Sequence, residues 1–404
     1  MNKILSLKID GVKNFENGLF EFDFTNKKNA RSNDGELFNI NGSIYTHNVI
    51  SLVGINSSGK STSAKLLSWA LDILSNSSIN PESFHNRTIP DILDDNIDLS
   101  FIAYSAKMKM IFKYCANIKK RNNYSLEIMD DCIYYKKFGQ SISKKDTQDF
   151  VSSEVITRDS VKKAIQQTSN SKYIISNYKF DSTECVLRYT DFYENFKIDL
   201  YTPDRFLRAP KFDNLSVNLL EYLDRSIDYI RKIDDEKATE DRTYELKFKN
   251  RDKVKLELYD LEDKLSTGTV RWISLFNIAV EVLKKGSYFV IDEIELSLHK
   301  SLSVDLIKLF SSKITNPLGA TLIFTTHYTE ILDHIKRTDS IYVTSKNDVG
   351  LSNVVNLSDL IQRNDLMKSD YYLKNLTKIQ TAPSRSIFNK LVDEVVQHIG
   401  TKDE

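Results

Sequence analysis

The segment that most constrains the fold of this chain is Gly54-Ile-Asn-Ser-Ser-Gly59-Lys60-Ser61, which matches the pattern G-x-x-x-x-G-K-[ST]. The apolar run HNVISLV precedes it, and apolar residues at helical spacing follow it as far as Asn76. A buried strand, a glycine-containing turn and a helix N-terminus in this order are typical of a phosphate-binding loop. The sequence therefore predicts an α/β fold with this loop at the edge of a mainly parallel sheet.

Each residue of this loop has an expected task. The two glycines let the backbone wrap closely, so that successive N–H groups of residues 56–61 can point at phosphates, and the helix N-terminus adds positive charge. Lys60 should reach the β- and γ-phosphates, and the Ser61 hydroxyl should bind Mg²⁺. ATP and Mg²⁺ are the predicted ligands. The predicted phosphate-binding residues are Gly54, Asn56, Ser57, Ser58, Gly59, Lys60, Ser61 and Thr62.

A second motif supplies the carboxylates that such a site needs. The apolar run Tyr288-Phe-Val-Ile is followed directly by Asp292 and Glu293. Asp292 is expected to hold Mg²⁺, and Glu293 is the candidate general base for the attacking water. Lys60 and Asp292 are 232 positions apart (292 − 60). A compact RecA-like or AAA+ module would bring them much closer, so a large insertion is expected between the two motifs.

Composition excludes several classes of protein. The 404 residues carry 56 Lys and Arg against 56 Asp and Glu, which argues against a polybasic nucleic-acid binder. The N-terminus lacks a signal-peptide pattern, and no run approaches the roughly 18 apolar residues of a membrane helix. Cys115, Cys132 and Cys185 are widely spaced and show neither a disulfide nor a zinc pattern, so separate thiols in a cytoplasmic protein are expected.

Hydrophobic periodicity predicts how the rest of the chain is organised. Two strands around the Asn17-Gly18 turn begin the chain, and short strand-like runs fill residues 96–203. Among these runs are KYIISNYKF (172–180) and CVLRY (185–189). Residues 214–233 have the pattern of an amphipathic helix, and a hairpin is expected over 244–260. From residue 270 onward, buried strands alternate with helices, which indicates a parallel sheet. A helix is predicted near the C-terminus.

Three further motifs appear in a fixed order around Asp292. Leu265-Ser266-Thr267-Gly268-Thr269 precedes it, Glu295-Leu-Ser297-Leu-His299 follows it, and Thr325-Thr-His327 ends the next apolar run. With the two motifs above, this order resembles the ABC-type ATPases of the SMC/RecF/OLD clade. More narrowly it resembles the ATPase proteins of bacterial abortive-infection and anti-phage systems, including the element Arg337-Thr-Asp339-Ser-Ile341. Thr267 stands where many ABC signatures have glycine.

The resemblance implies roles for these residues. His327 would act beside Glu293 as a catalytic residue, and Ser297 would belong to the D-loop. The signature residues Ser266, Thr267, Gly268 and Thr269 would cap ATP bound by a second copy of the chain. The expected unit is therefore a head-to-tail homodimer, or a higher homo-oligomer, with ATP between the copies.

The resemblance also implies a domain plan and a function. The ATPase head would comprise residues 1–84 and 256–346 and would combine the mainly parallel sheet with an antiparallel β-lobe. Residues 85–255 would be an inserted β-rich and helical lobe that could partly complete the head sheet, and residues 347–404 would be a C-terminal extension. The expected function is an ATP-hydrolysing switch or sensor of an anti-phage system. It would respond to a phage protein and control a nuclease or toxin on a separate chain, with no nuclease activity of its own.

Two alternatives remain open at this stage. One is a RecF- or SMC-like DNA-repair or chromosome-maintenance ATPase that binds DNA directly, and the other is an ATP-locked scaffold with little turnover. The Lys-rich stretches Lys107–Lys120 and Lys136–Lys145 could contact nucleic acid, or could be solvated strand edges.

Overall fold

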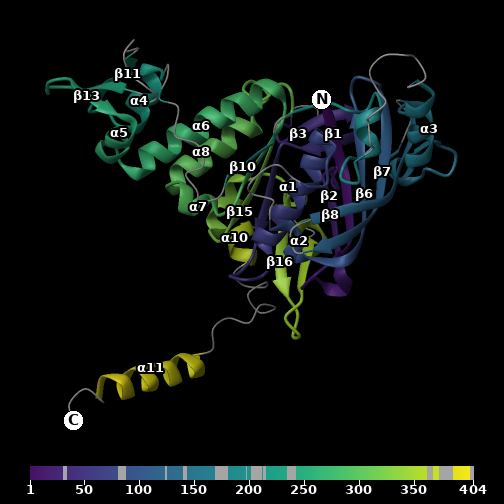
Figure 1. Ribbon diagram of the computed structural model, residues 1–404. Coiled ribbons are helices and arrows are strands. Elements are labelled where there is room, and N and C mark those ends of the chain that lie inside the picture. Colours follow the sequence, from purple (N-terminus) through teal and green to yellow (C-terminus); the bar gives the residue numbers. More distant parts are fainter. Residues whose placement is uncertain are drawn as a thin grey trace.

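A mainly parallel sheet carries the phosphate-binding loop, as Figure 1 shows for this computed structural model. The strand order is β10-β14-β15-β5-β16-β17, and only the β16–β17 pair is antiparallel. The strands are β5 (Val49–Val53), β10 (Ile198–Tyr201), β14 (Tyr288–Ile291), β15 (Thr321–Thr326), β16 (Ile341–Lys346) and β17 (Ser352–Asn356). The structure describes residues 1–30, 34–80, 88–122, 125–139, 143–168, 181–196, 198–201, 212, 215–233, 243–361, 367–372 and 385–400.

A second, antiparallel sheet has the strand order β2-β1-β6-β7-β8-β9. Its strands are β1 (Asn2–Val12), β2 (Leu19–Asp23), β6 (Leu93–Ser105), β7 (Met110–Asn122), β8 (Ser125–Lys137) and β9 (Glu154–Thr157). Helix α1 (Lys60–Asn76) packs between the two sheets, because its apolar residues share one core cluster with alternate residues of β1, β5, β6 and β7. The expected combination of a parallel and an antiparallel sheet is confirmed.

The other face of the parallel sheet is covered by helices. Alternate residues of β5, β14 and β15 form a second core with α6 (Thr267–Lys285), α8 (Lys300–Ser311) and the 3₁₀ helix η5 (Thr329–His334). Both faces of these strands are therefore buried, which explains why their sequences read as continuous apolar runs. The short helix α7 (Ile294–Ser297) follows β14 directly.

A small lobe stands beside the N-terminal end of α6 (Figure 1). It consists of α4 (Val217–Leu223), a three-stranded antiparallel sheet of β11 (Ile227–Ile233), β12 (Thr243–Phe248) and β13 (Val254–Glu257), and α5 (Leu258–Lys264). Its core includes Val270 and Ile273 of α6. The region between the two nucleotide motifs therefore contributes β6–β9 to the antiparallel sheet, β10 to the parallel sheet, and this lobe.

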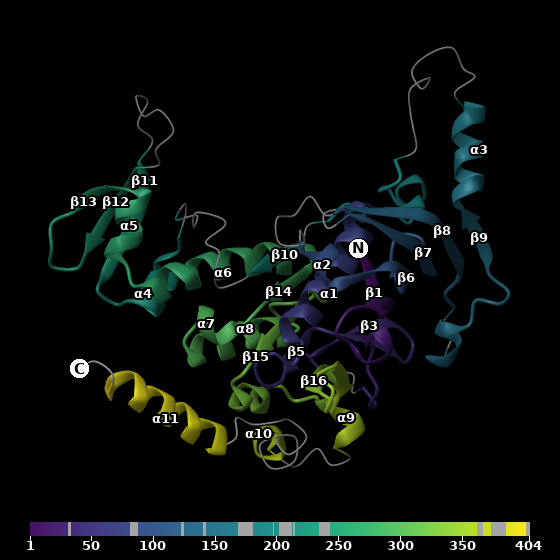
Figure 2. The same cartoon turned by 60° about the horizontal axis from the view of Figure 1, so that its bottom comes forward.

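The remaining elements are short, except for two helices. They are β3 (Leu37–Asn41), β4 (Ile44–His47), α2 (Ile89–Ile92), α3 (Arg158–Thr168), α9 (Leu357–Leu360), α10 (Lys368–Tyr371), α11 (Arg385–Gly400) and the 3₁₀ helices η1 (Glu16–Gly18), η3 (Lys145–Gln148), η4 (Val186–Tyr189) and η6 (Thr338–Ser340). Helix α11 lies apart from the rest in both views (Figures 1 and 2). Among the residues described, no helix is both long and apolar enough to cross a membrane.

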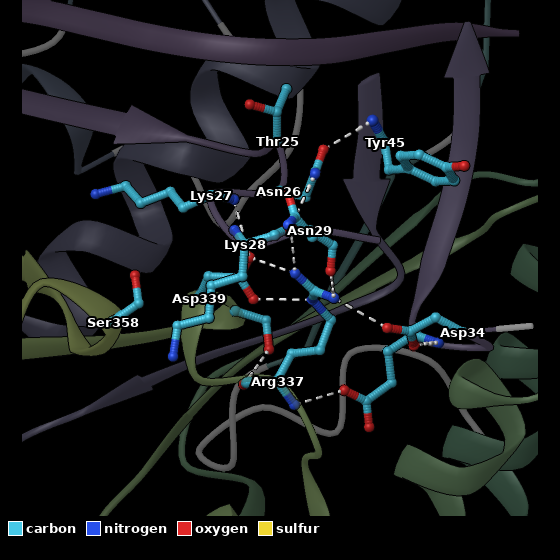
Figure 3. A network of polar contacts seen from close by, with 12 residues as sticks. Thr25, Asn26, Lys27, Lys28, Asn29, Asp34, Tyr45, Arg337, Asp339 and Ser358 are labelled. Atoms are coloured by element: carbon cyan, nitrogen blue, oxygen red, sulfur yellow. Dashed lines mark hydrogen bonds and ion pairs between the residues drawn. The ribbon is translucent and has the colours of Figure 1, made fainter. Parts of the chain in front are cut away.

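A buried polar network ties the N-terminal segment to the turn before β16, as Figure 3 shows. The Arg337 guanidinium donates to both carboxylate oxygens of Asp339, at 2.8 and 2.6 Å, and to Asp34 at 3.0 Å. The Glu36 carboxylate accepts the backbone N–H groups of Lys336 and Arg337. The Arg-Thr-Asp-Ser-Ile element recognised in the sequence therefore fixes the strand β16 that flanks the phosphate-binding loop.

Several predicted elements require correction. Residues 214–233 do not form one helix, because α4 ends at Leu223 and β11 begins at Ile227. The Asp224 side chain accepts the N–H and hydroxyl of Ser226, which closes a turn between them. The run CVLRY is not a strand, since Val186–Tyr189 is a 3₁₀ helix. The predicted strand KYIISNYKF lies outside the described residues.

Candidate functional site

The loop 54–59 joins β5 to α1, and both of its glycines are needed by its shape. Gly59 has φ +104°, and a Cβ there would lie 2.8 Å from the Ser352 hydroxyl oxygen. A Cβ on Gly54 would overlap the side chains of Thr344 and Ser58. Neither position accepts a larger residue without moving the strands beside it, so the loop is held against β16 and β17.

The other predicted phosphate-binding residues lie where the motif places them. Asn56 and Ser57 are exposed, and Thr62 is half-buried in the first turn of α1. The buried Ser58 side chain is hydrogen-bonded to Thr344 at 2.6 Å. Ser58 therefore anchors the loop through its side chain and leaves its neighbours to face solvent.

Lys60 is nearly buried at the first position of α1. Its ammonium group donates to the carbonyl oxygens of Gly54 at 2.9 Å and Ile55 at 2.8 Å. Burial lowers the pKa of Lys60 to about 8, while the carboxylates of Glu295, Asp292 and Glu293 act in the opposite direction. The Lys60 ammonium group therefore lies inside the curve of the loop.

Ser61 and Asp292 meet across the 231 positions that separate them. The Ser61 hydroxyl donates to Asp292 Oδ1 at 3.1 Å, and the Thr325 hydroxyl donates to the same oxygen at 2.6 Å. These residues come from the start of α1 and from two neighbouring parallel strands, β14 and β15. Since the carboxyl ends of parallel strands open at one edge of a sheet, the topology brings the two motifs together.

Glu293 and His327 lie beside this junction. The Glu293 N–H donates to the Thr325 hydroxyl at 2.7 Å, and Glu293 has a left-handed backbone with φ 50°. His327 Nε2 lies 3.7 Å from Glu293 Oε1, and both side chains are about one-third exposed. Both can therefore meet a ligand that enters the same edge of the sheet.

Glu295 is a further polar residue at the site that the sequence assigned only to the D-loop segment. Its Oε1 accepts the backbone N–H of His327, and its buried Oε2 has no hydrogen-bond partner among the described residues. It is also the strongest of the carboxylates acting on Lys60. Ser297, the predicted D-loop residue, is the last residue of α7.

The signature residues lie at the N-terminal end of α6, away from the phosphate-binding loop. Ser266 is the N-cap of α6, and its hydroxyl accepts the Thr269 N–H at 3.0 Å. Ser266, Thr267 and Gly268 are exposed, whereas Thr269 is buried. This end of α6 lies beside α4 and α5, away from α1 (Figures 1 and 2). Within the described part of one chain, no hydrogen bond joins the signature to the phosphate-binding loop.

The residues present fit a nucleoside triphosphate with Mg²⁺. Gly54 and Gly59 form a cradle that a side chain would fill, and Lys60 provides a buried cation. The Ser61 hydroxyl and the Asp292 carboxylate are hard oxygen ligands of the kind that Mg²⁺ prefers. Mg²⁺ needs only one or two protein ligands where substrate phosphates also bind it.

A family model described as "AAA domain, putative AbiEii toxin, Type IV TA system" matches residues 49–333. The chain belongs to this AAA-domain family. The match runs from β5 to η5, so the region between the two nucleotide motifs is part of the family domain. Membership of the AAA-domain family supports a P-loop ATPase related to abortive-infection systems. No curated protein matches the chain significantly.

Proposed function

We propose that this AAA-family chain is an ATP-binding and ATP-hydrolysing switch subunit of a bacterial abortive-infection system. The observation that carries the proposal is the hydrogen-bonded junction of Ser61, Asp292 and Thr325, with Lys60, Glu293 and His327 around it. The family description supports the link to abortive infection. Within that family we place the chain with the ABC-type heads of the SMC/RecF/OLD clade, on the order of its five motifs.

The residues of the site have separate tasks in this proposal. The backbone N–H groups of the loop and the Lys60 ammonium bind the phosphates, while Ser61 and Asp292 hold Mg²⁺. Bound Mg²⁺ would neutralise charge on the phosphate oxygens. Glu293 accepts a proton from the attacking water, and His327 contacts the γ-phosphate oxygens. Glu295 holds the backbone of His327 in place through its N–H.

The proposal extends to a head-to-tail dimer. The exposed signature at the start of α6 is separated from the phosphate-binding loop of its own chain, which supports a role in capping ATP bound by a second copy. The dimer would hold two ATP molecules, close on ATP binding and open on hydrolysis. Closure would then be the signal passed to an effector protein, a nuclease or toxin on a separate chain.

Nucleotide binding tests the first step of this proposal. We expect Lys60→Ala to weaken binding of a fluorescent ATP analogue at least tenfold, because charge-assisted hydrogen bonds contribute about 1.5–3 kcal/mol. Lys65→Ala, which removes a half-buried lysine from the same helix, is the matched control and should bind as the unmodified chain does. Equal affinity of the two variants for the ATP analogue would show that Lys60 does not bind the nucleotide.

A DNA-repair ATPase that binds DNA directly is the alternative to the proposed switch subunit. Two of the lysines that could face nucleic acid are engaged within the chain, since Lys144 pairs with Asp23 at 2.9 Å and Lys136 donates to backbone carbonyls near Asp146. Salt-dependent binding of duplex DNA by the isolated chain at low micromolar protein would favour the repair class instead.

A further inference from the structure

Two of the three cysteines face each other on neighbouring strands. Cys115 on β7 and Cys132 on β8 are direct cross-strand partners in the antiparallel register, and both are half-buried. Their separation in the sequence gives no sign of this pairing. Cys185, the third cysteine, is fully buried and lies directly before η4.

The strand pairing has the dimensions that a disulfide requires. Directly opposed residues of antiparallel strands have Cα atoms about 4.5–5.5 Å apart and side chains on the same face. A disulfide bridges Cα atoms about 4.4–6.8 Å apart, so a bond between these two residues needs no movement of the strands. The two thiols are close enough to shift each other's pKa values.

The surroundings give the two sulfurs different reactivity. The hydrogen bond from Cys115, with a second from Tyr134, lowers the pKa of Cys132 to about 7, although burial and nearby aspartates oppose this. The same hydrogen bond, followed by burial, raises the pKa of Cys115. Cys132 is therefore partly thiolate near neutral pH, while Cys115 keeps its proton. Thiolates, and not thiols, attack oxidants.

The pair is also partly exposed and firmly held. Phe112, Tyr114 and Ala116 of β7 are buried in the core with α1, so Cys115 lies on the opposite face of the sheet. On that face, Ser100, the β6 partner of Cys115, lines a cavity of about 450 Å³. The residue before Cys132 is fixed on the inner face.

That inner residue is Asp131, which is paired with buried Arg158 at 2.6 Å and accepts the Tyr114 hydroxyl at 2.9 Å. The Tyr114 hydrogen bond joins β8 to β7, and the Arg158 ion pair joins β8 to the start of α3. Buried contacts therefore help to set the register that opposes the two cysteines. The thiols therefore stay opposite each other, half-buried on the outer face of the sheet.

We propose that Cys115 and Cys132 form a peroxide-reactive dithiol that closes reversibly to an intramolecular disulfide. The Cys132 thiolate attacks one oxygen of hydrogen peroxide, the O–O bond breaks, and the departing oxygen leaves as hydroxide that solvent protonates. This leaves a sulfenic acid on Cys132. Cys115 then attacks the Cys132 sulfur, the S–O bond breaks, and the hydroxide takes the Cys115 proton. Two thiols and one hydrogen peroxide give one disulfide and two waters.

The test is thiol counting on the folded full-length chain with hydrogen peroxide as the probe. After brief treatment, the chain should lose the mass of two hydrogen atoms, and peptide mapping after maleimide alkylation should show a Cys115–Cys132 bridge that dithiothreitol reverses. Cys115→Ser should instead leave a sulfenic acid on Cys132 that dimedone traps. Cys185→Ser is the matched control and should form the bridge normally.

Cys132→Ser separates the two roles, because it should leave Cys115 alkylatable after the same treatment. Circular dichroism verifies that each variant is folded before its thiols are counted. The proposal is overturned if treated protein keeps all of its thiols, if the bridge involves Cys185 or a second chain, or if dimedone fails to label Cys132 in a folded Cys115→Ser variant. None of these readouts depends on ATP binding or hydrolysis.

Discussion

At the scale of single residues, His47 shows how burial fixes a protonation state. It ends β4 close to the Arg337–Asp339 network, and its two ring nitrogens have no hydrogen-bond partner among the described residues. Burial lowers the pKa of His47 to about 4, although Asp339 acts in the opposite direction. The folded chain therefore carries a neutral histidine beside the Arg337–Asp339 network that precedes β16.

This shift predicts a loss of stability in acid. The unfolded chain binds a proton on His47 below about pH 6.5, whereas the folded chain does so only below about pH 4. Between these values the unfolded state binds more protons, so the free energy of unfolding falls as the pH falls, by up to about 1.4 kcal/mol per pH unit for this group. We expect urea unfolding of His47→Gln to show a shallower decline across that window.

The control for this prediction is His334→Gln, which changes an exposed histidine of η5. It should follow the pH dependence of the unmodified chain. A His47→Gln variant that loses stability with the same slope as the unmodified chain would mean that His47 is not held neutral by the fold.

Residues of the site differ in how far the sequence reveals them. The junction of Ser61 and Asp292 could be predicted, because each residue has a fixed place in a motif and parallel strands bring their carboxyl ends together. Glu295 could not be assigned its contact, since its partner is the backbone N–H of His327, and a backbone group leaves no trace in a residue pattern. The Cys115–Cys132 pairing depends on strand register, which the sequence of these strands does not specify.

At the scale of elements, the two motif glycines near helix N-termini have different reasons to be glycine. Gly59 has a positive φ and is crowded by Ser352, whereas a Cβ on Gly268 would meet only the Ser266 hydroxyl oxygen, at 3.8 Å. The first is therefore required by the fold of the isolated chain. The second has no such requirement, which is consistent with a role in contacts made outside the chain.

Alanine substitutions separate these two cases. We expect Gly59→Ala to lower the free energy of unfolding by about 1–3 kcal/mol, because alanine is strained at this φ. Gly268→Ala should leave the stability unchanged or raise it by about 0.5 kcal/mol, since it lies in the first turn of α6. Urea denaturation of both variants measures the difference. Equal destabilisation by the two changes would contradict this account of the glycines.

Element types could be predicted where the pattern was long and unambiguous. The β1–β2 hairpin, β5, α1, the β12–β13 hairpin, α6 and the strands β14–β16 all follow the periodicity of their residues. The helix predicted over 214–233 is wrong because β-branched and aromatic residues continue the apolar pattern after Leu223, while the Asp224 turn changes the backbone from helix to strand. Short polar turns of this kind compete with a periodic pattern.

At the scale of the whole molecule, the proposed dimer depends on the exposed N-terminal end of α6. We expect Glu293→Gln with Mg²⁺ and ATP to elute at twice the mass of the single chain. Adding Gly268→Asp should abolish this doubling, because the new carboxylate would face the phosphates bound by the other copy. An aspartate in the first turn of a helix favours the helix itself, so the isolated chain should remain folded.

Light scattering coupled to size exclusion measures this mass, and Gly268→Ala in the same Glu293→Gln background is the milder comparison. ATP-dependent doubling that persists in the Gly268→Asp variant would show that the signature does not lie between the two copies. A dimer that forms equally without nucleotide would place the interface elsewhere.

Phosphate release from ATP by the Glu293→Gln variant tests the central claim most directly. The Glu293 N–H, and not its side chain, makes the bond to Thr325, so this change should keep the site folded and ATP bound. We expect turnover to fall by about a hundredfold or more, as for loss of a general base. Glu281→Gln on the exposed face of α6 should release phosphate at the rate of the unmodified chain. Unchanged turnover in Glu293→Gln would contradict the proposed hydrolytic site.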